Sequence, residues 1–372
     1  MRYRSALFHV LYRIFLKPIF FAQDPEVIHD RMVMMGARLG RNKMGRKLLR
    51  ICFNYAHPSL GQNKWGVYFC NPVGLAAGFD KEGQLCTIVG DIGFGFSEVG
   101  TVTYGAYEGN PKPRLYRLPH SQGLVVYYGL KNSGAQKIAD HLKKQKKTIP
   151  QIVSIGKTNC SITADEGKGA VDYKNCLDLF QSNGVGDIYE INISCPNTFG
   201  GEPFTTSDKL KRLLEILCAK ESKKPIILKM PINLRWEEFR TLLDIAVQFG
   251  VHAVNIGNLN KDRSDTAIKE KIPDYIHGSV SGKPTWKLSN ELIFRAYAYC
   301  GDKITIIGTG GIFSAEDAYE KIKRGASLVQ LITGMIYEGP QLISSINYEL
   351  VRLLKRDGYA TIVEAVGAYH RT

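Results

Sequence analysis

The sequence lacks the cysteine and histidine spacings that bind zinc. Its eight cysteines form no C-x-x-C pair, and no histidine lies at a ligand spacing from a cysteine pair. We therefore expect no metal site. Free thiols also indicate a reducing compartment, because disulfide-stabilised proteins pair their cysteines.

Long apolar runs are also missing. The first 23 residues, MRYRSALFHVLYRIFLKPIFFAQ, are rich in apolar and aromatic side chains but are interrupted by Arg13 and Lys17. A transmembrane helix needs about 20 consecutive apolar residues, and a signal peptide needs a small-residue cleavage site. This segment matches neither.

Acidic residues are scarce relative to basic ones. The chain has 49 Lys and Arg against 35 Asp and Glu, a net charge of +14. Such an excess favours phosphate-rich partners, either nucleic acid or an anionic membrane. The basic residues gather in the first fifty positions, which favours a surface-docking N-terminal segment over a nucleic-acid groove, so we expect no nucleic-acid partner.

Two apolar-periodic stretches in this segment predict helices, over residues 5–22 and 25–39. In the first, helical spacing aligns the side chains of Leu7, Val10, Leu11, Ile14, Phe15 and Ile19. One interpretation is a helical cap packed on the domain. The other is an amphipathic pair that rests on a membrane surface.

From residue 71 onward, short apolar runs alternate with helix-like stretches. This alternation predicts parallel strands with crossover helices, and the count predicts a closed (β/α)8 TIM barrel with a small N-terminal helical extension. We divide the chain into an extension, 1–50, and a catalytic barrel, 51–372. The predicted strands are 71–77, 96–102, 151–156, 187–193, 224–230, 251–257, 304–309 and 327–332.

In such barrels the active site lies at the C-terminal ends of the strands. The segment INISCPNTFGGEPF places Cys195 there, flanked by Asn192 and Asn197. A buried cysteine is usually a small apolar residue, and we assign that role to the other seven. A thiolate at Cys195 could remove a carbon-bound proton if its pKa is lowered or the transfer is coupled to hydride departure.

Glycine-rich segments follow the seventh and eighth strands, GTGGI and TGMIYEG. Backbone N–H groups in these loops can bind a phosphate. Lys229 ends an apolar strand, where it could stabilise a reduced flavin or form a structural salt bridge. Lys81 has the same two interpretations and could also bind a substrate carboxylate.

The order of several motifs resembles the dihydroorotate dehydrogenase family from about residue 66 to about residue 345. These motifs are NPVGLAAGFDK, EVGTVT, GNPKPRLYRL, INISCPNT, ILKM, SGKP, IIGTGGI and GASLVQLITG. The N-terminal DPEVIHDRM resembles the extension of the membrane-associated, quinone-using class 2 enzymes. The resemblance implies FMN as cofactor, dihydroorotate and orotate as substrate and product, and a role in pyrimidine biosynthesis.

The resemblance also implies roles for individual residues. Cys195 matches the catalytic base, and His29 and Arg117 match positions near the quinone. Substrate-binding positions fall on Lys81, Asn192, Asn197 and Asn258. FMN-binding positions fall on Ala77, Gly78, Thr101, Ser154, Asn192, Lys229, Gly257, Gly282, Gly310, Gly311, Thr333 and Gly334.

The chain departs from the class 2 pattern at several of these positions. Class 2 enzymes normally use serine as the base, whereas Cys195 is typical of the soluble class 1 enzymes. Val126 replaces a substrate-binding asparagine. Ser154, Gly257 and Ile332 replace an asparagine, a threonine and a tyrosine.

We therefore predict an FMN-dependent oxidation of dihydroorotate to orotate that passes electrons to a membrane quinone. The expected location is peripheral, on the cytoplasmic face of a bacterial-type inner membrane. One alternative is a soluble class 1-like enzyme that uses fumarate or NAD, or a paralogue that oxidises another dihydropyrimidine. A remote alternative is a non-enzymatic basic protein that binds lipid or nucleic acid.

Overall fold

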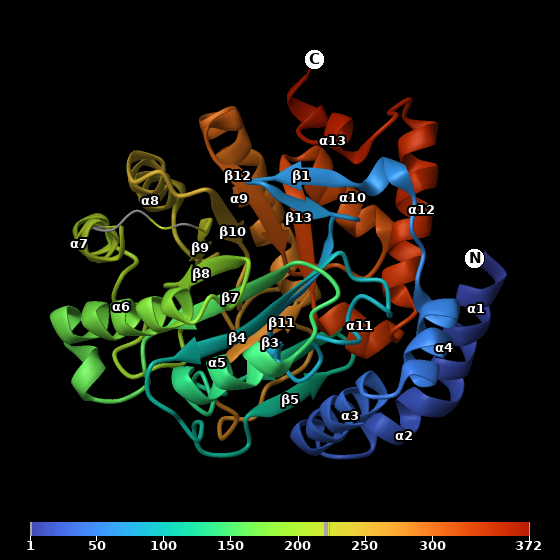
Figure 1. Cartoon of the computed structure of the whole chain (residues 1–372), viewed down its shortest axis with the longest axis horizontal. Helices are drawn as coiled ribbons and strands as arrows, with labels where there is room; N and C mark the ends of the chain where they lie inside the picture. The colour runs from blue at the N-terminus through green and yellow to red at the C-terminus, as the bar shows by residue number, and fades with distance from the viewer. Residues whose placement is uncertain (1, 219–221, 223, 372) are drawn as a thin grey trace.

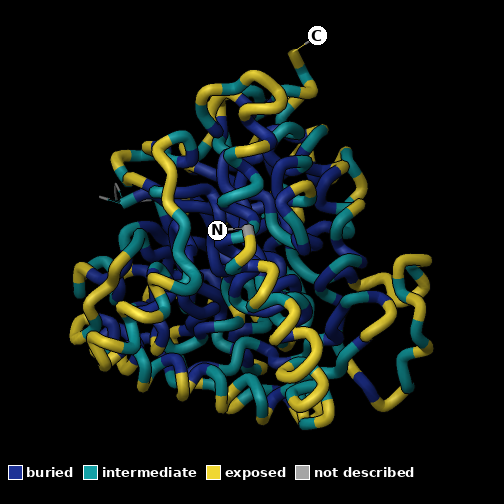
Figure 2. The backbone as a smooth tube through the Cα atoms, turned by 90° about the vertical axis from the view of Figure 1, so that its right-hand side faces the viewer, coloured by how far each residue is buried: buried dark blue, intermediate teal, exposed yellow. Residues whose placement is uncertain are grey.

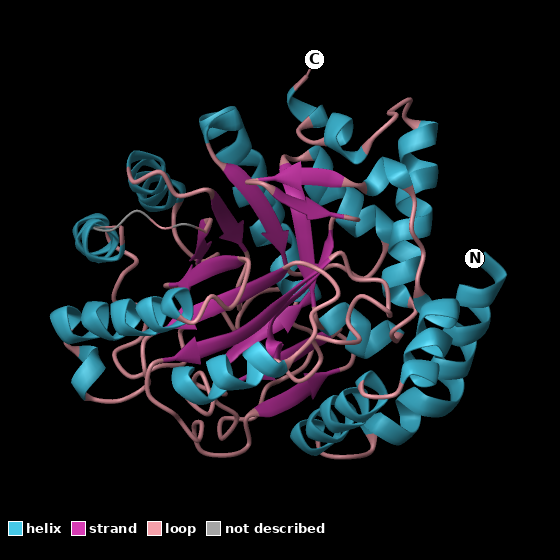
Figure 3. Cartoon of the chain, viewed as in Figure 1, coloured by secondary structure: helices cyan, strands magenta, loops and turns pink. Residues whose placement is uncertain are grey.

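The core of the computed structural model is a closed barrel of eight parallel strands (Figures 1 and 3). The structure describes residues 2–218, 222 and 224–371. Around the barrel the strand order is β10-β12-β13-β3-β4-β7-β8-β9. Their bounds are β3 Val73–Asp80, β4 Phe96–Thr103, β7 Gln151–Gly156, β8 Ile188–Asn192, β9 Ile226–Met230, β10 Ala253–Ile256, β12 Thr305–Thr309 and β13 Ala326–Leu331.

All eight barrel strands lie where the apolar runs predicted them. Helices cover the outside of the barrel, as expected for parallel strands joined by crossovers. They are α5 Ala135–Lys144, α6 Glu166–Ser182, α7 Ser207–Leu217, α8 Trp236–Gln248, α9 Trp286–Cys300, α10 Ala315–Lys323, α11 Thr333–Glu338 and α12 Leu342–Arg356. A last short helix, α13, spans Ile362–Ala365.

The N-terminal end of the barrel is closed by apolar packing. Phe96, Ile152, Ile188 and Ile227 come from the first residues of their strands and form one buried cluster with Phe69. Phe69 belongs to a small hairpin, β1 Gln62–Lys64 and β2 Val67–Phe69. This plug leaves the C-terminal ends of the strands as the open side of the barrel.

A second sheet was not predicted. Strands β5 Leu115–Leu118, β6 Gly123–Val126 and β11 Ser279–Gly282 form an antiparallel sheet in the order β11-β6-β5. The strands have four residues each, and β11 lies more than 150 positions beyond β6, so no local pattern reveals the pairing. The sheet brings Val126 and Gly282 to the open end of the barrel.

The N-terminal extension is helical throughout. A continuous helix consists of α1 Arg2–Leu11, a π-helical turn Tyr12–Leu16 and α2 Lys17–Phe21. It is followed by α3 Pro25–Gly40, so both predicted helices are present. A further helix, α4 Lys43–Phe53, was not predicted and continues past residue 50, where we had placed the end of the extension.

Side-chain caps and ion pairs define these helices. Asp24 accepts hydrogen bonds from two backbone N–H groups at the start of α3, and Asn42 does the same for α4. Arg46 and Arg50 of α4 both pair with the buried carboxylate of Asp91. These contacts explain why α4 packs on the barrel although its sequence is strongly basic.

The first helix buries little of its apolar side. Tyr12 is buried and its hydroxyl donates to the carbonyl of Ile336 at 2.6 Å, but Ile14 and Phe15 are 59% and 60% exposed. Figure 2 shows the extension facing the viewer, with much of its first helix exposed. Over the part of the chain that the structure describes, no helix has the length and apolarity to cross a membrane.

Candidate functional site

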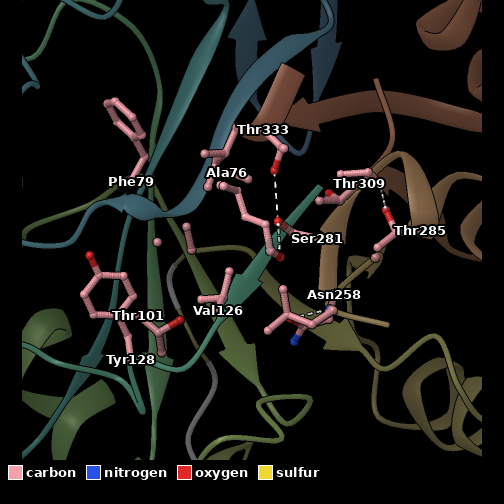
Figure 4. Close-up of a pocket in the computed structure, with 18 of the residues that line it drawn as sticks. Ala76, Phe79, Thr101, Val126, Tyr128, Asn258, Ser281, Thr285, Thr309 and Thr333 are labelled. Carbon is pink, nitrogen blue, oxygen red and sulfur yellow. Dashed lines mark hydrogen bonds between the residues drawn. The ribbon is translucent and has the colours of Figure 1, made fainter. Parts of the chain in front are cut away.

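A cavity opens at the C-terminal end of the barrel, where the barrel strands meet β6 and β11 (Figure 4). Its volume is about 210 Å³. Most residues predicted for the site line it. They are His29, Ala77, Gly78, Lys81, Thr101, Asn192, Cys195, Asn197, Lys229, Gly257, Asn258, Gly282, Gly310, Gly311, Thr333 and Gly334.

Cys195 reaches the cavity from the loop that follows β8. Burial raises the pKa of its thiol to about 11, although the backbone N–H of Asn197 and the charges of Lys229 and Lys157 oppose the rise. The group is therefore a thiol at neutral pH rather than a pre-formed thiolate. Cys195 was expected to act as a base either through a lowered pKa or through coupling to hydride departure. The structure does not provide the lowered pKa.

Three asparagines that line the cavity are fixed by hydrogen bonds to their neighbours. The Asn192 amide donates to Thr101 Oγ1 at 2.9 Å, and its oxygen accepts from the Ser194 N–H at 3.1 Å. Asn197 donates to the carbonyl of Val126 at 2.9 Å, and Asn258 donates to the carbonyl of Ser194 at 2.6 Å. These bonds set the orientation of each amide toward the cavity.

Lys81 lies between an aromatic ring and a histidine of the extension. Its ammonium is 4.0 Å from the centre of the Tyr128 ring and 3.1 Å from His29 Nε2. Burial lowers the pKa of Lys81 to about 8, and burial together with Lys81 lowers the pKa of His29 to about 3. His29 is therefore neutral and accepts a hydrogen bond from Lys81.

Two residues predicted for the site do not line the cavity. Arg117 donates to the carbonyls of Phe20, Phe21 and Gln23, so it holds the turn between α2 and α3. Ser154 is fully buried below the cavity and bonds Thr101 Oγ1 at 2.9 Å. In this position Ser154 is linked to the cavity through Thr101, which lines it.

Beneath the cavity lies a network of polar groups that we call the polar floor. Every strand of the barrel contributes to it, and its members form hydrogen bonds and an ion pair with one another. Its members, in chain order, are Ala77 through its backbone N–H, Glu98, Ser154, Glu190, Lys229, Asn255, Thr309 and Gln330.

Most of the polar floor was missed from the sequence. Glu98 and Glu190 each interrupt an otherwise apolar predicted strand, FSEVGTV and DIYEINI, and both have no solvent exposure. A buried carboxylate needs a cation or a hydrogen-bond donor beside it. A glutamate inside a buried strand could therefore have indicated a polar network in the barrel. Lys229 fits both of its interpretations, because it lies 3.6 Å from Glu190 Oε1 and also lines the cavity.

Comparison with known proteins agrees with this arrangement. The family model for dihydroorotate dehydrogenase matches residues 59–354. The chain belongs to the dihydroorotate dehydrogenase family. Sequence relatives named dihydroorotate dehydrogenase (quinone) include one from Crocosphaera subtropica, 38% identical over 92% of this chain and 94% of the relative, and one from Gloeobacter violaceus, 36% identical over 96% and 98%.

A solved dihydroorotate dehydrogenase has the same fold. The ligand-free enzyme from Eimeria tenella superposes with a TM-score of 0.83 at 26% identity and covers 94% of this chain and 100% of its own. The matched regions of these relatives span nearly the whole chain, including much of the helical extension. The predicted barrel and family are thereby confirmed.

Dihydroorotate dehydrogenases are FMN-dependent flavoproteins, and the cavity fits that cofactor. Gly310 and Gly311 have φ angles of 99° and 74°, in the region that favours glycine, and a Cβ on Gly334 would collide with the carbonyl of Ile312. The loops after β12 and β13 therefore present backbone without side chains, which suits a phosphate. Lys229 supplies a cation from β9, which is separated from β12 by a single strand.

Proposed function

We propose that this chain oxidises dihydroorotate to orotate with Cys195 as the base and passes the electrons to a membrane quinone. The observation that carries the proposal is the position of Cys195 in the cavity, among three oriented asparagines and Lys229. FMN, held by Lys229 and by the glycine loops after β12 and β13, would supply the acceptor for the hydride that leaves C6 of the substrate. Cys195 takes the proton from C5, and the two losses leave the C5–C6 double bond of orotate.

The raised pKa of Cys195 constrains how the proton is removed. Only the thiolate accepts a proton, and burial disfavours that form. Lys229 and Lys157 stabilise the thiolate electrostatically but do not offset the burial. We infer that the C–H proton transfer is coupled to departure of the hydride, and that the rate grows with the thiolate fraction.

Lys81 and the asparagines are proposed to hold the substrate. A cationic Lys81 suits the carboxylate of dihydroorotate, and its pKa of about 8 leaves it mostly protonated at neutral pH. Asn192, Asn197 and Asn258 offer fixed amides to the ring. Val126 cannot donate a hydrogen bond, so the Asn197 amide that bonds its carbonyl supplies the polar contact on that side.

The extension is proposed to dock on a membrane and to lead the quinone toward the flavin. Its first helix exposes Leu7, Ile14, Phe15 and Ile19, an apolar surface that a soluble domain would normally cover. Basic residues in the same segment favour an anionic lipid surface. A peripheral position on the cytoplasmic face of a bacterial-type inner membrane accounts for both features.

The decisive experiment compares Cys195→Ala with the wild-type holoenzyme. We expect the variant to keep FMN, seen in the flavin absorbance, but to reduce it with dihydroorotate at least a thousandfold more slowly under anaerobic conditions. Cys195→Ser is the control whose hydroxyl ionises less readily than the thiol, and it should fall between the two. Reduction of FMN at the wild-type rate in Cys195→Ala would refute the assignment.

The acceptor is tested separately. Steady-state rates with a quinone, fumarate and NAD distinguish the membrane enzyme from a soluble class 1-like enzyme. We expect quinone to support turnover and the other two to fail. A second dihydropyrimidine oxidised faster than dihydroorotate would redirect the substrate assignment to a paralogous reaction.

A further inference from the structure

Two carboxyl groups lie together in the polar floor without exposure to solvent. Glu98 comes from β4 and Glu190 from β8, the strands on either side of β7. Two amides link them, since Gln330 donates to Glu98 while Asn255 donates both to Glu190 and to Gln330. Taking an ionised carboxylate out of water costs several kcal/mol unless a cation or several donors compensate it. One cation, Lys229, lies within ion-pair distance of Glu190.

The contacts of Glu190 are those of an anion. Oε1 accepts from Ser154 Oγ at 3.0 Å and lies 3.6 Å from the ammonium of Lys229, and Oε2 accepts from the Asn255 amide at 2.6 Å. Each of these neighbours is a donor. The carboxylate is therefore satisfied in its charged form.

The contacts of Glu98 are different. Oε2 accepts from the Gln330 amide at 2.8 Å and from the backbone N–H of Ala77 at 3.4 Å. Oε1 is buried and no described residue donates to it. A proton on Oε1 that points to Glu190 satisfies this oxygen and adds a donor to the Glu190 carboxylate.

We propose that Glu98 and Glu190 share one proton, carried on Glu98 Oε1, and that their single negative charge partly offsets the positive charge of Lys229 beside the flavin site and so sets the reduction potential of bound FMN. Both glutamates act through Lys229 and are positioning residues. The electrostatics agree: burial and the neighbouring Glu190 raise the pKa of Glu98 well above its usual value. Burial opposes the charge of Glu190, but Lys229 and the hydrogen-bond donors hold its pKa below the usual value.

The polar floor also connects this pair to the substrate side. Asn192 donates to Thr101 Oγ1, which bonds Ser154 Oγ at 2.9 Å, and Ser154 in turn donates to Glu190. The anion therefore orients an asparagine that faces the substrate as well as the lysine. A neutral pair would leave both without their anchor.

The test measures the reduction potential of FMN in the holoenzyme, by equilibration with a redox dye and flavin absorbance. Glu98→Gln replaces a protonated carboxyl by a neutral amide of the same shape, so we expect an unchanged potential. The double variant Glu98→Gln with Glu190→Gln removes the negative charge and should raise the potential, because an uncompensated Lys229 stabilises the reduced, anionic flavin.

Each alternative charge state gives a different result. If both glutamates were ionised, Glu98→Gln alone would raise the potential, and if both were protonated, the double variant would not change it. Either result overturns the proposal. The measurement requires FMN bound at this site, as the proposed function does, but neither substrate nor electron acceptor. It can therefore be made even if the protein does not oxidise dihydroorotate.

Infrared spectroscopy of the wild-type protein gives a measurement that does not depend on a variant folding. We expect the carbonyl band of one buried, protonated carboxylic acid near neutral pH. Its absence from the wild type would overturn the proposal. The band should disappear in Glu98→Gln and persist in Glu316→Gln, a matched change on the surface of α10.

Discussion

The barrel end buries polar side chains, whereas the N-terminal extension exposes apolar ones. Below the cavity, charged, amide and hydroxyl groups from all eight strands are bonded to one another. In the extension, Ile14 and Phe15 remain exposed to water. The first arrangement gives a rigid, charge-balanced site, and the second leaves a surface for an apolar partner.

From this comparison we expect substitutions in the polar floor to lower the free energy of unfolding most. Lys229→Met leaves the Glu190 carboxylate without its cation, and breaking a buried ion pair in this way costs about 3–5 kcal/mol. Urea unfolding followed by circular dichroism measures the loss. Lys174→Met, which removes a surface pair with Asp178, is the control and should cost less than about 0.5 kcal/mol.

The chemistry of the barrel end should depend on pH. Because burial raises the pKa of Cys195 to about 11, the thiolate fraction rises with pH, and flavin reduction should accelerate roughly tenfold per pH unit from about pH 7 to about pH 9. Rapid-mixing kinetics with dihydroorotate measures this slope. Cys195→Ala should lack it, because alanine has no group to ionise, and a flat wild-type profile would contradict the assigned base.

Substrate binding should show the opposite trend. Burial lowers the pKa of Lys81 to about 8, so its positive charge is lost as the pH rises through that value. We expect the KM for dihydroorotate to increase above about pH 8 while kcat still rises. A KM that stays constant to about pH 10 would remove Lys81 from the carboxylate site.

His29 is where the two regions meet. His29→Ala removes the acceptor that holds Lys81, a contact worth about 1 kcal/mol, so the KM for dihydroorotate should rise roughly five- to tenfold. Anaerobic flavin reduction measures the effect without a quinone. His29→Gln keeps an acceptor and should restore much of the affinity, whereas equal defects in both variants would refute this role.

The smallest effect on stability is expected in the extension. Ile14→Asp should change the free energy of unfolding by less than about 0.5 kcal/mol, because the side chain is already exposed. Binding to anionic lipid vesicles should fall at least about tenfold, since burying one isoleucine in lipid is worth roughly 1.5–3 kcal/mol. Ile14→Leu is the matched control. Unchanged vesicle binding in Ile14→Asp would show that this exposed surface does not bind the membrane.

The sequence predicted the parts of the fold that follow from local periodicity. The eight strands were visible as apolar runs, and residues directly after them, such as Cys195 and Asn258, were correctly expected at the cavity. Helix α4 was not predicted, and it packs on the barrel through two basic residues that pair with Asp91, a contact that no local pattern reveals. The sheet β11-β6-β5 was missed because its strands pair over long separations.

By itself, the sequence determined the barrel, the extension and the set of side chains at the strand ends, since each depends on a repeating pattern along the chain. Only the tertiary structure decided which groups meet: Arg117 with the turn after α2, His29 with Lys81, and Glu98 with Glu190. Charge state and hydrogen-bond partner depend on burial and on neighbours from other strands. Closing the barrel buries these groups and brings their neighbours together in the same step. No single segment of the sequence could therefore predict these contacts.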